Sequence, residues 1–254
     1  MKPLTIDEIR QVAARINKRT YDYEAPFLQK VDQILDDSEG KHVETVLGEA
    51  FTGLLAQVDD EIKEIESELG VRPSCALGCD HCCYFPIIVT RLEVKLMLKV
   101  IKSWPAARRR KIAAQIDRYV TTYQAELKEL AELDFRKDPA FKERYKQKNL
   151  PCIMLDQETR TCMAYEIRPI PCRTYLNYAS PDVCGESHVP AEPLSFEFLY
   201  PFYVEGMDEV LTEILEVVDD SALGFSYPQD AAEVHYLPLL LQEEWRGGAV
   251  IAGE

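Results

Sequence analysis

Eight cysteines in two sets constrain this chain more than any other feature of its sequence. The stretch CALGCDHCC holds the first set, Cys75, Cys79, Cys82 and Cys83, and the second set follows downstream as Cys152, Cys162, Cys172 and Cys184. The N-terminal stretch has no continuous apolar segment of a secretory signal, so we expect a cytoplasmic chain whose thiols stay reduced. Eight cysteines then predict metal binding or thiol chemistry in place of four structural disulfides.

The composition is that of a globular protein that can build an ordinary core, with 46% hydrophobic and 29% charged residues in 254. No apolar run reaches the ~18 residues of a membrane span, so none is expected. The net charge of −15, from 44 acidic and 29 basic residues, disfavours nucleic acid and anionic membranes as partners. We therefore expect metal ions as partners and leave room for a protein substrate or partner.

The spacing of Cys75, Cys79 and Cys82 is C-x3-C-x2-C, which enzymes that cleave S-adenosylmethionine at an iron–sulfur cluster share. Those enzymes need several βα units, with the cysteine loop after the first strand. Here the loop follows residues 41–69, in which apolar side chains recur at steps of three and four and predict a long helix. This context disfavours a radical enzyme.

The rest of the chain also predicts helices, and strands are scarce. Thr5 with Glu8 and Thr90 with Glu93 have the spacing of capping boxes, and Gly70 is placed to end the long helix. We expect helices over about residues 6–16, 26–36, 41–69, 92–101, 105–130, 138–149, 207–218 and 231–245. The aromatic stretch LSFEFLYPFYV is expected to be a short strand or an apolar loop. The predicted fold is mostly α, a helical scaffold around a loop-rich cysteine-cluster metal region.

The motifs predict three parts along the chain. Residues 1–72 are expected to form an N-terminal helical segment, and residues 73–190 a metal-binding domain that carries a helical insert over 90–148. Residues 191–254 are expected to be a helical tail that packs on the same body.

The cysteine motifs resemble those of the YkgJ-type cysteine-cluster family, which is described as a zinc- or iron-chelating domain with a C-x-x-C-x-x-C-C core. The matching pieces are CALGCDHCC, PCIML, TCMAYEIRPIPCRTY and DVCG, which together contain all eight cysteines. The resemblance covers about residues 74–186. The chain departs from it in a first gap of three residues and in the 68 residues between Cys83 and Cys152.

Bacterial flagellin lysine methylases look like distant relatives of this family. The resemblance therefore implies either a redox role or a methylase-like, protein-modifying role. The sequence shows no S-adenosylmethionine pocket, so no catalytic residue is assigned and enzymatic activity stays open. The alternative is a structural zinc-binding module for interaction or assembly, without catalysis.

The spacing of the cysteines favours iron–sulfur over zinc. Structural zinc usually takes two tight cysteine pairs, but the second set has gaps of nine, nine and eleven residues. A cubane cluster accepts one close group of cysteines and one distant cysteine. Adjacent Cys82 and Cys83 point apart and suit two metals or two cluster corners. Eight thiolates suit two four-cysteine centres, and thiol redox chemistry without a metal is a third interpretation.

Several charged residues near the cysteines have expected roles in addition to those of the thiols. Arg168 and Arg173 flank Cys172, and we expect them to compensate the negative charge of metal-bound thiolates and to donate N–H groups to them, with surface ion pairing as the alternative. Asp80 is expected to be a turn residue. His81 is expected to lie beside the centre or to face solvent, because the cysteines already suffice as ligands, with metal ligation in place of one cysteine as the alternative. The basic run Arg108–Lys111 is expected to be a solvated helix face, with a local contact to an anion or a partner as the alternative.

Overall fold

The computed structural model describes residues 2–187 and 194–247, and the chain is mostly α-helical with small two-stranded sheets, as predicted. Backbone contacts divide it into two compact units. Unit 1 comprises Met1–Ala76 and Glu166–Gly224, and unit 2 comprises Leu77–Tyr165 and Phe225–Glu254. The chain therefore passes from one unit to the other three times.

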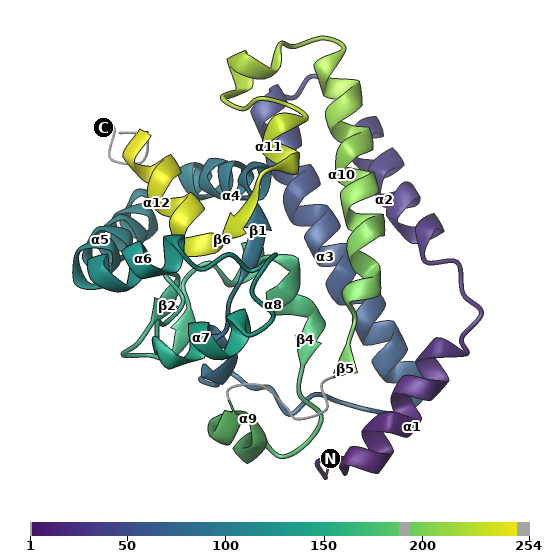
Figure 1. Cartoon of the computed structure of the whole chain (residues 1–254). Coiled ribbons are helices and arrows are strands. Elements are labelled where there is room, and N and C mark those ends of the chain that lie inside the picture. Colours follow the sequence, from purple (N-terminus) through teal and green to yellow (C-terminus); the bar gives the residue numbers. More distant parts are fainter. Residues whose placement is uncertain (1, 188–193, 248–254) are drawn as a thin grey trace. The chain divides into compact units, whose positions relative to one another are not determined.

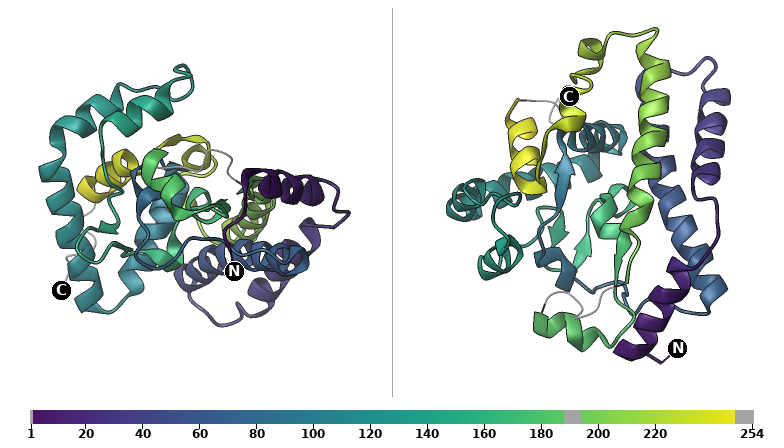
Figure 2. Two further views of the ribbon diagram at one scale, coloured as in Figure 1. Left: turned by 90° about the horizontal axis from the view of Figure 1, so that it is seen from below. Right: turned by 45° about the vertical axis from the view of Figure 1, so that its right-hand side comes forward.

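Unit 1 is built on a packed group of three helices, α2, α3 and α10, which run side by side (Figures 1 and 2). Its helices are α1 (Ile6–Asn17), α2 (Glu24–Asp36), α3 (Val43–Leu69), α8 (Ile170–Thr174), α9 (Pro181–Ser187) and α10 (Tyr200–Leu215), with the 3-10 helices η3 (Glu197–Leu199) and η4 (Asp220–Leu223). Its strands β4 (Tyr175–Leu176) and β5 (Leu194–Ser195) pair antiparallel.

The apolar stripe of α3 forms the centre of this unit. Residues such as Leu47, Phe51 and Leu54 are completely or almost completely buried, which follows from their spacing of three and four residues. In α10, a Cβ atom at Gly206 would lie 3.1 Å from Leu54 Cδ2. The missing side chain therefore allows α10 to approach α3 closely.

Unit 2 contains the second helical group and the antiparallel strand pairs β1–β6 and β2–β3. Its helices are α4 (Arg91–Ser103), α5 (Ala106–Thr122), α6 (Gln124–Ala131), α7 (Phe141–Gln147), α11 (Gln229–Ala232) and α12 (Leu237–Gly247), with the 3-10 helix η1 (His81–Tyr84). The 3-10 helix η2 (Tyr165–Ile167) begins at Tyr165 in unit 2 and continues into the segment of unit 1 that starts at Glu166. Its strands are β1 (Ile88–Thr90), β2 (Leu155–Asp156), β3 (Thr161–Cys162) and β6 (Val234–Tyr236).

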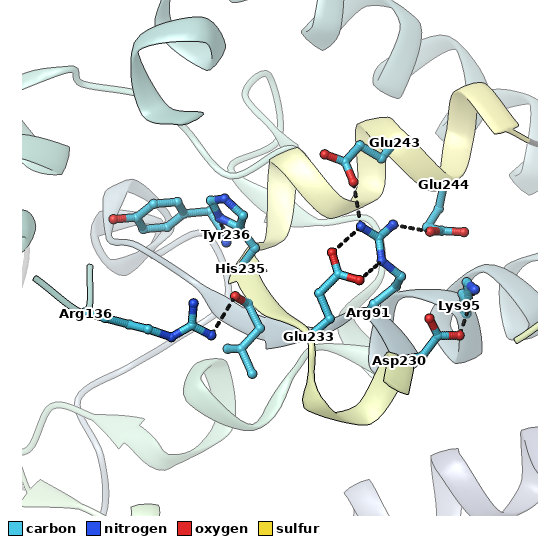
Figure 3. Close-up of polar contacts among 10 residues, drawn as sticks. Arg91, Lys95, Arg136, Asp230, Glu233, His235, Tyr236, Glu243 and Glu244 are labelled. Atoms are coloured by element: carbon cyan, nitrogen blue, oxygen red, sulfur yellow. Dashed lines mark hydrogen bonds and ion pairs between the residues drawn. The ribbon is translucent and has the colours of Figure 1, made fainter. Parts of the chain in front are cut away.

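An ion-pair network fastens the C-terminal segment of unit 2 to the start of α4. Arg91 donates to both carboxylate oxygens of Glu233 and also binds Glu243 and Glu244 of α12, as Figure 3 shows. Beside it Lys95 pairs with Asp230 at 2.7 Å. The same segment supplies β6, which pairs with β1 in the register Val89 to His235. Residues more than 130 positions apart in sequence are thus held together.

The helix boundaries agree with the sequence at several ends and differ at others. Both capping boxes form, and Gly70 ends α3 in the left-handed conformation at φ 67°. The helix expected over 105–130 breaks at Tyr123 into α5 and α6. The helix expected over 231–245 is wrong in its first part, because residues 234–236 pair with β1. The last helix of unit 1 begins at Tyr200, seven residues before the predicted start, because Pro201 occupies its first turn.

Within the parts of the chain that the structure describes, none of the helices is both long and apolar enough to span a bilayer.

Candidate metal centre

The two units divide the eight cysteines five to three, not along the two sets of the sequence. Unit 2 holds Cys79, Cys82, Cys83, Cys152 and Cys162, and unit 1 holds Cys75, Cys172 and Cys184. Cys75 and Cys82 are exposed, Cys184 is buried, and the other five are partly exposed.

The first cysteines of unit 2 lie in a tight turn. Gly78 precedes them at φ 87°, a conformation that a residue with a side chain rarely adopts. The amide of Cys83 donates to the carbonyl of Asp80 at 2.9 Å, and the amide of Phe85 donates to the carbonyl of Cys82 at 3.1 Å. Cys82 and Cys83 are therefore consecutive residues of a 3-10 helix, in which neighbouring side chains point about 120° apart.

The other cysteines of unit 2 flank a short hairpin formed by β2 and β3. Cys162 lies opposite Leu155 in this pair, and the carbonyl of Cys152 accepts from the amide of Leu155 at 2.9 Å. Asp156 caps the turn by accepting from the amides of Glu158 and Thr159. The hairpin therefore brings Cys152 and Cys162 to the same end of the strand pair, although nine residues separate them.

Two contacts fasten the turn of Cys79–Cys83 to this hairpin. The amide of Cys152 donates to the carbonyl of Cys83 at 2.6 Å. Arg160, in the hairpin turn at φ 55°, donates from Nε to Asp80 Oδ1 at 3.0 Å and binds the same oxygen through Nη2. A backbone bond and an ion pair thus connect two segments that lie about 70 residues apart in the sequence.

Charge and burial keep the thiol of Cys152 protonated in the metal-free protein. Burial is the largest of the effects that raise the pKa of Cys152 to about 12. Negative charge on Cys162 and, to a smaller extent, on Cys82 adds to it, and a backbone hydrogen bond from Met154 opposes it. These effects place Cys162 and Cys82 within electrostatic reach of Cys152. A metal ion that bound here would have to displace the proton, as metals do at thiols.

The cysteines of unit 1 have different neighbours. Cys75 Sγ accepts from the amide of Asn177 at 3.4 Å, and the amide of Ser74 donates to the carbonyl of Asn177 at 2.6 Å. Cys172 lies in α8, where its amide donates to the carbonyl of Pro169 at 2.9 Å. Cys184 is buried in α9. The segment of Cys75 is thus held against the chain that follows α8.

Arg168 and Arg173 contact the carboxylate of Asp59 on α3. Arg173 is only 2% exposed. It binds Asp59 through Nη1, and it donates to the carbonyls of Arg168 and Glu166 at 2.8 and 2.5 Å. Arg168 lies 3.7 Å from the other oxygen of Asp59. Burial lowers the pKa of Arg173, and the charge of Asp59 opposes this effect. Compensation of thiolate charge by these arginines stays a prediction.

Three residues that support these segments were not assigned such a role from the sequence. Arg160 and Asp59 stand in no motif, and their contacts depend on residues far away in the chain. Arg108, expected on a solvated face, instead lies 3.5 Å from the ring centre of Trp104 and donates to the carbonyl of Met163 at 3.0 Å. A sequence signal for the contact of Arg108 was the aromatic Trp104 four positions before it, between the end of α4 and the start of α5.

The donor chemistry of the cysteines fits zinc or iron, because both metals bind thiolates in proteins. Across residues 2–187 and 194–247, however, no three His, Cys, Asp or Glu side chains already lie in an arrangement that could hold a metal ion. The backbone contacts gather the cysteines of unit 2, and metal binding would have to complete the arrangement of their side chains.

Comparison with known proteins identifies the cysteine-containing part of the chain. No curated protein and no solved structure matches the chain. The model of the CxxCxxCC family, whose description is "Putative zinc- or iron-chelating domain", matches residues 74–188. This segment contains all eight cysteines and agrees with the resemblance drawn from their motifs. The cysteine-containing segment 74–188 is therefore similar to the CxxCxxCC family.

Proposed function

We propose that this protein binds zinc or iron through its cysteine thiolates, and that four of the five cysteines of unit 2 form one such centre. The observation that carries the proposal is the 2.6 Å hydrogen bond from the amide of Cys152 to the carbonyl of Cys83. It supports a single centre because it brings the distant Cys152 to the turn that holds Cys79, Cys82 and Cys83. The family match, which spans all eight cysteines, extends the proposal to the other four, Cys75, Cys162, Cys172 and Cys184, as metal ligands.

Iron–sulfur is the preferred form of the centre in unit 2. Its ligands come from a tight turn and from a separate hairpin, and a cubane needs ligands at separate corners. The divergent side chains of Cys82 and Cys83 suit two corners better than one metal ion. An iron–sulfur centre would supply electron transfer or substrate positioning, and we propose a redox or protein-modifying role for the protein on this basis.

A structural zinc site is the second candidate. The ion pair between Arg160 and Asp80 and the bond between Cys152 and Cys83 already fasten the two ligand segments together. Four-thiolate zinc sites commonly serve to hold such segments in place. In this case the protein would be a module for interaction or assembly, and the metal would have no catalytic role.

Metal analysis after anaerobic purification tests the proposal and separates its two forms. A brown protein with broad visible absorbance, iron and acid-labile sulfide would support the iron–sulfur form, and a colourless protein with bound zinc would support the structural form. Neither metal in the purified protein, nor after reconstitution with zinc or with iron and sulfide, would overturn the proposal.

A pair of variants locates the centre in unit 2. We expect Cys152→Ser to reduce the bound metal, because it removes the ligand that the hairpin contributes. Met154→Leu is the matched control, because it changes a buried residue of the same segment without removing a thiol and nearly conserves side-chain volume. Equal metal content in Cys152→Ser and the parent protein would contradict the location.

A further inference from the structure

An ion pair joins the two segments that carry the cysteines of unit 2. It is formed by Arg160 of the hairpin and Asp80 of the turn. We propose that Arg160 is a positioning residue that holds the turn of Cys79–Cys83 against the hairpin and supplies positive charge to the thiolate centre. This inference rests on the proposed metal centre and names a residue that neither the cysteine motif nor the family description assigns.

The backbone of Arg160 is arranged for this contact. It lies in the hairpin turn with φ 55°, a left-handed conformation that is uncommon for a residue other than glycine. Asp156 stabilises the start of the same turn through the amides of Glu158 and Thr159. The turn thus directs the guanidinium toward Asp80, the residue that follows Cys79.

The contact between Arg160 and Asp80 restrains direction as well as distance. Two nitrogens of the same guanidinium, Nε and Nη2, bind one oxygen of the carboxylate. Asp80 also accepts the amide of Cys83 through its backbone carbonyl, so its position determines the start of the 3-10 helix that carries Cys82 and Cys83. Holding Asp80 therefore holds the cysteines on both sides of it.

The charge of Arg160 is placed to act on the centre itself. Four thiolates around a divalent metal ion leave a net negative charge, which a nearby cation stabilises. Arg160 binds Asp80, which directly follows Cys79, and Arg160 itself lies two positions before Cys162, so its guanidinium is held between segments that carry cysteines. Arg168 and Arg173, which the sequence favoured for this role, belong to unit 1 and bind Asp59 there.

Cobalt(II) provides a direct test, because its thiolate complexes absorb visibly and report both ligand geometry and release. The metal-free full-length protein would be reconstituted with cobalt(II) alone and mixed with excess chelator. We expect Arg160→Gln to release cobalt about two- to fivefold faster than the parent, the range of an exposed ion pair. Arg160→Lys should lie between the two, because lysine keeps the charge but not the planar fork of donors.

Two further variants separate the inference from a general loss of charge or stability. Arg10→Gln removes a comparable exposed arginine that pairs with Asp7 in unit 1, and we expect it to release cobalt at the parental rate. Asp80→Asn removes the anchor but keeps the charge of Arg160. If Asp80→Asn released cobalt as fast as Arg160→Gln does, the charge of Arg160 would make no contribution of its own, and that part of the proposal would be overturned. Thermal melting of the metal-free proteins checks that Arg160→Gln still folds.

The outcomes distinguish this inference from the proposal beneath it. Uptake of cobalt with thiolate absorption by the parent, together with parental release from Arg160→Gln, would overturn the role of Arg160 and leave the metal centre standing. A folded parent that takes up no cobalt would overturn the centre in unit 2, and the role of Arg160 with it.

Discussion

At the scale of single residues, the two capping boxes show how burial reverses the electrostatics of one motif. In the first, Glu8 accepts from the amide of Thr5 at 2.7 Å in an exposed position, and this bond holds its pKa below the usual value. In the second, Glu93 accepts from the amide of Thr90 at 2.9 Å, but burial raises its pKa despite the same kind of bond. The sequence predicted the capping boxes, whereas the direction of each glutamate's pKa shift depended on tertiary packing.

The two glutamates therefore predict opposite responses of stability to pH. Glu8, with a lowered folded-state pKa, stabilises the fold above its unfolded-state pKa of about 4.3, and this contribution is lost as pH falls through the folded-state pKa. Glu93, with a raised pKa, makes its full contribution below about pH 4.3 and loses it as pH rises through the folded-state pKa.

Glutamine variants measured by urea unfolding between about pH 3 and 7, on either side of the unfolded-state pKa of glutamate, would test this contrast. Relative to the parent, Glu93→Gln should gain stability as pH rises, because glutamine carries no charge to bury. Glu8→Gln is the matched control in the exposed box and should lose stability over the same interval. Parallel pH profiles for the two variants would contradict the prediction.

At the scale of elements, the segment that carries Cys172 is held to the long helix α3 by one buried arginine. Arg173 binds Asp59 of α3 and two carbonyls of its own segment. A buried guanidinium is costly unless its charge is compensated. The contact therefore fixes α8 on α3 as long as Asp59 keeps its charge.

Removal of that charge should destabilise unit 1. We expect Asp59→Asn to lower the free energy of unfolding by roughly 2–4 kcal/mol, because it leaves Arg173 buried without its counter-charge. The neighbouring Asp60 pairs with Lys63 in an exposed position, so Asp60→Asn should change stability by less than about 0.5 kcal/mol. Chemical denaturation of both variants checks this, and equal effects would count against a structural role of the buried pair.

The sequence predicted elements where the cause was local and missed them where it was distant. The stripe of α3, its stop at Gly70 and both capping boxes depend on residues within a few positions of one another, and all were recognised. The strand at 234–236 was not, because it forms only by pairing with residues 88–90. The division of the cysteines was missed for the same reason. Cys75 pairs with the chain near Asn177, far from the rest of its motif.

At the scale of the whole molecule, the cysteine segments and the helical group of unit 1 should respond differently to metal. The segments around residues 75–85 and 152–184 have few regular backbone bonds, whereas α2, α3 and α10 are continuous helices with buried faces. Regions that few contacts hold are the first to open. Metal binding is therefore expected to order the cysteine segments and to leave the three helices largely unchanged.

Hydrogen exchange with and without metal tests this expectation. We predict that a strong chelator speeds amide exchange in residues 75–85 and 152–184, while exchange in α2, α3 and α10 changes little. The buried amides of α3 are the internal control. Unchanged exchange in the cysteine segments after confirmed removal of the metal would show that metal binding and folding are not coupled here.

The threefold passage of the chain between its two units limits how the protein can be divided into pieces. The family segment, residues 74–188, contains every cysteine, but it includes neither α3, to which Arg173 is bound, nor β6, which pairs with β1. Expressed alone, this segment would contain β1 without its partner strand β6, and Arg173 without the carboxylate of Asp59. A piece that is to keep the surroundings of the cysteines therefore has to include α3 and β6 in addition to the family segment, and insertions or deletions in these two elements are expected to affect the segments that carry the cysteines.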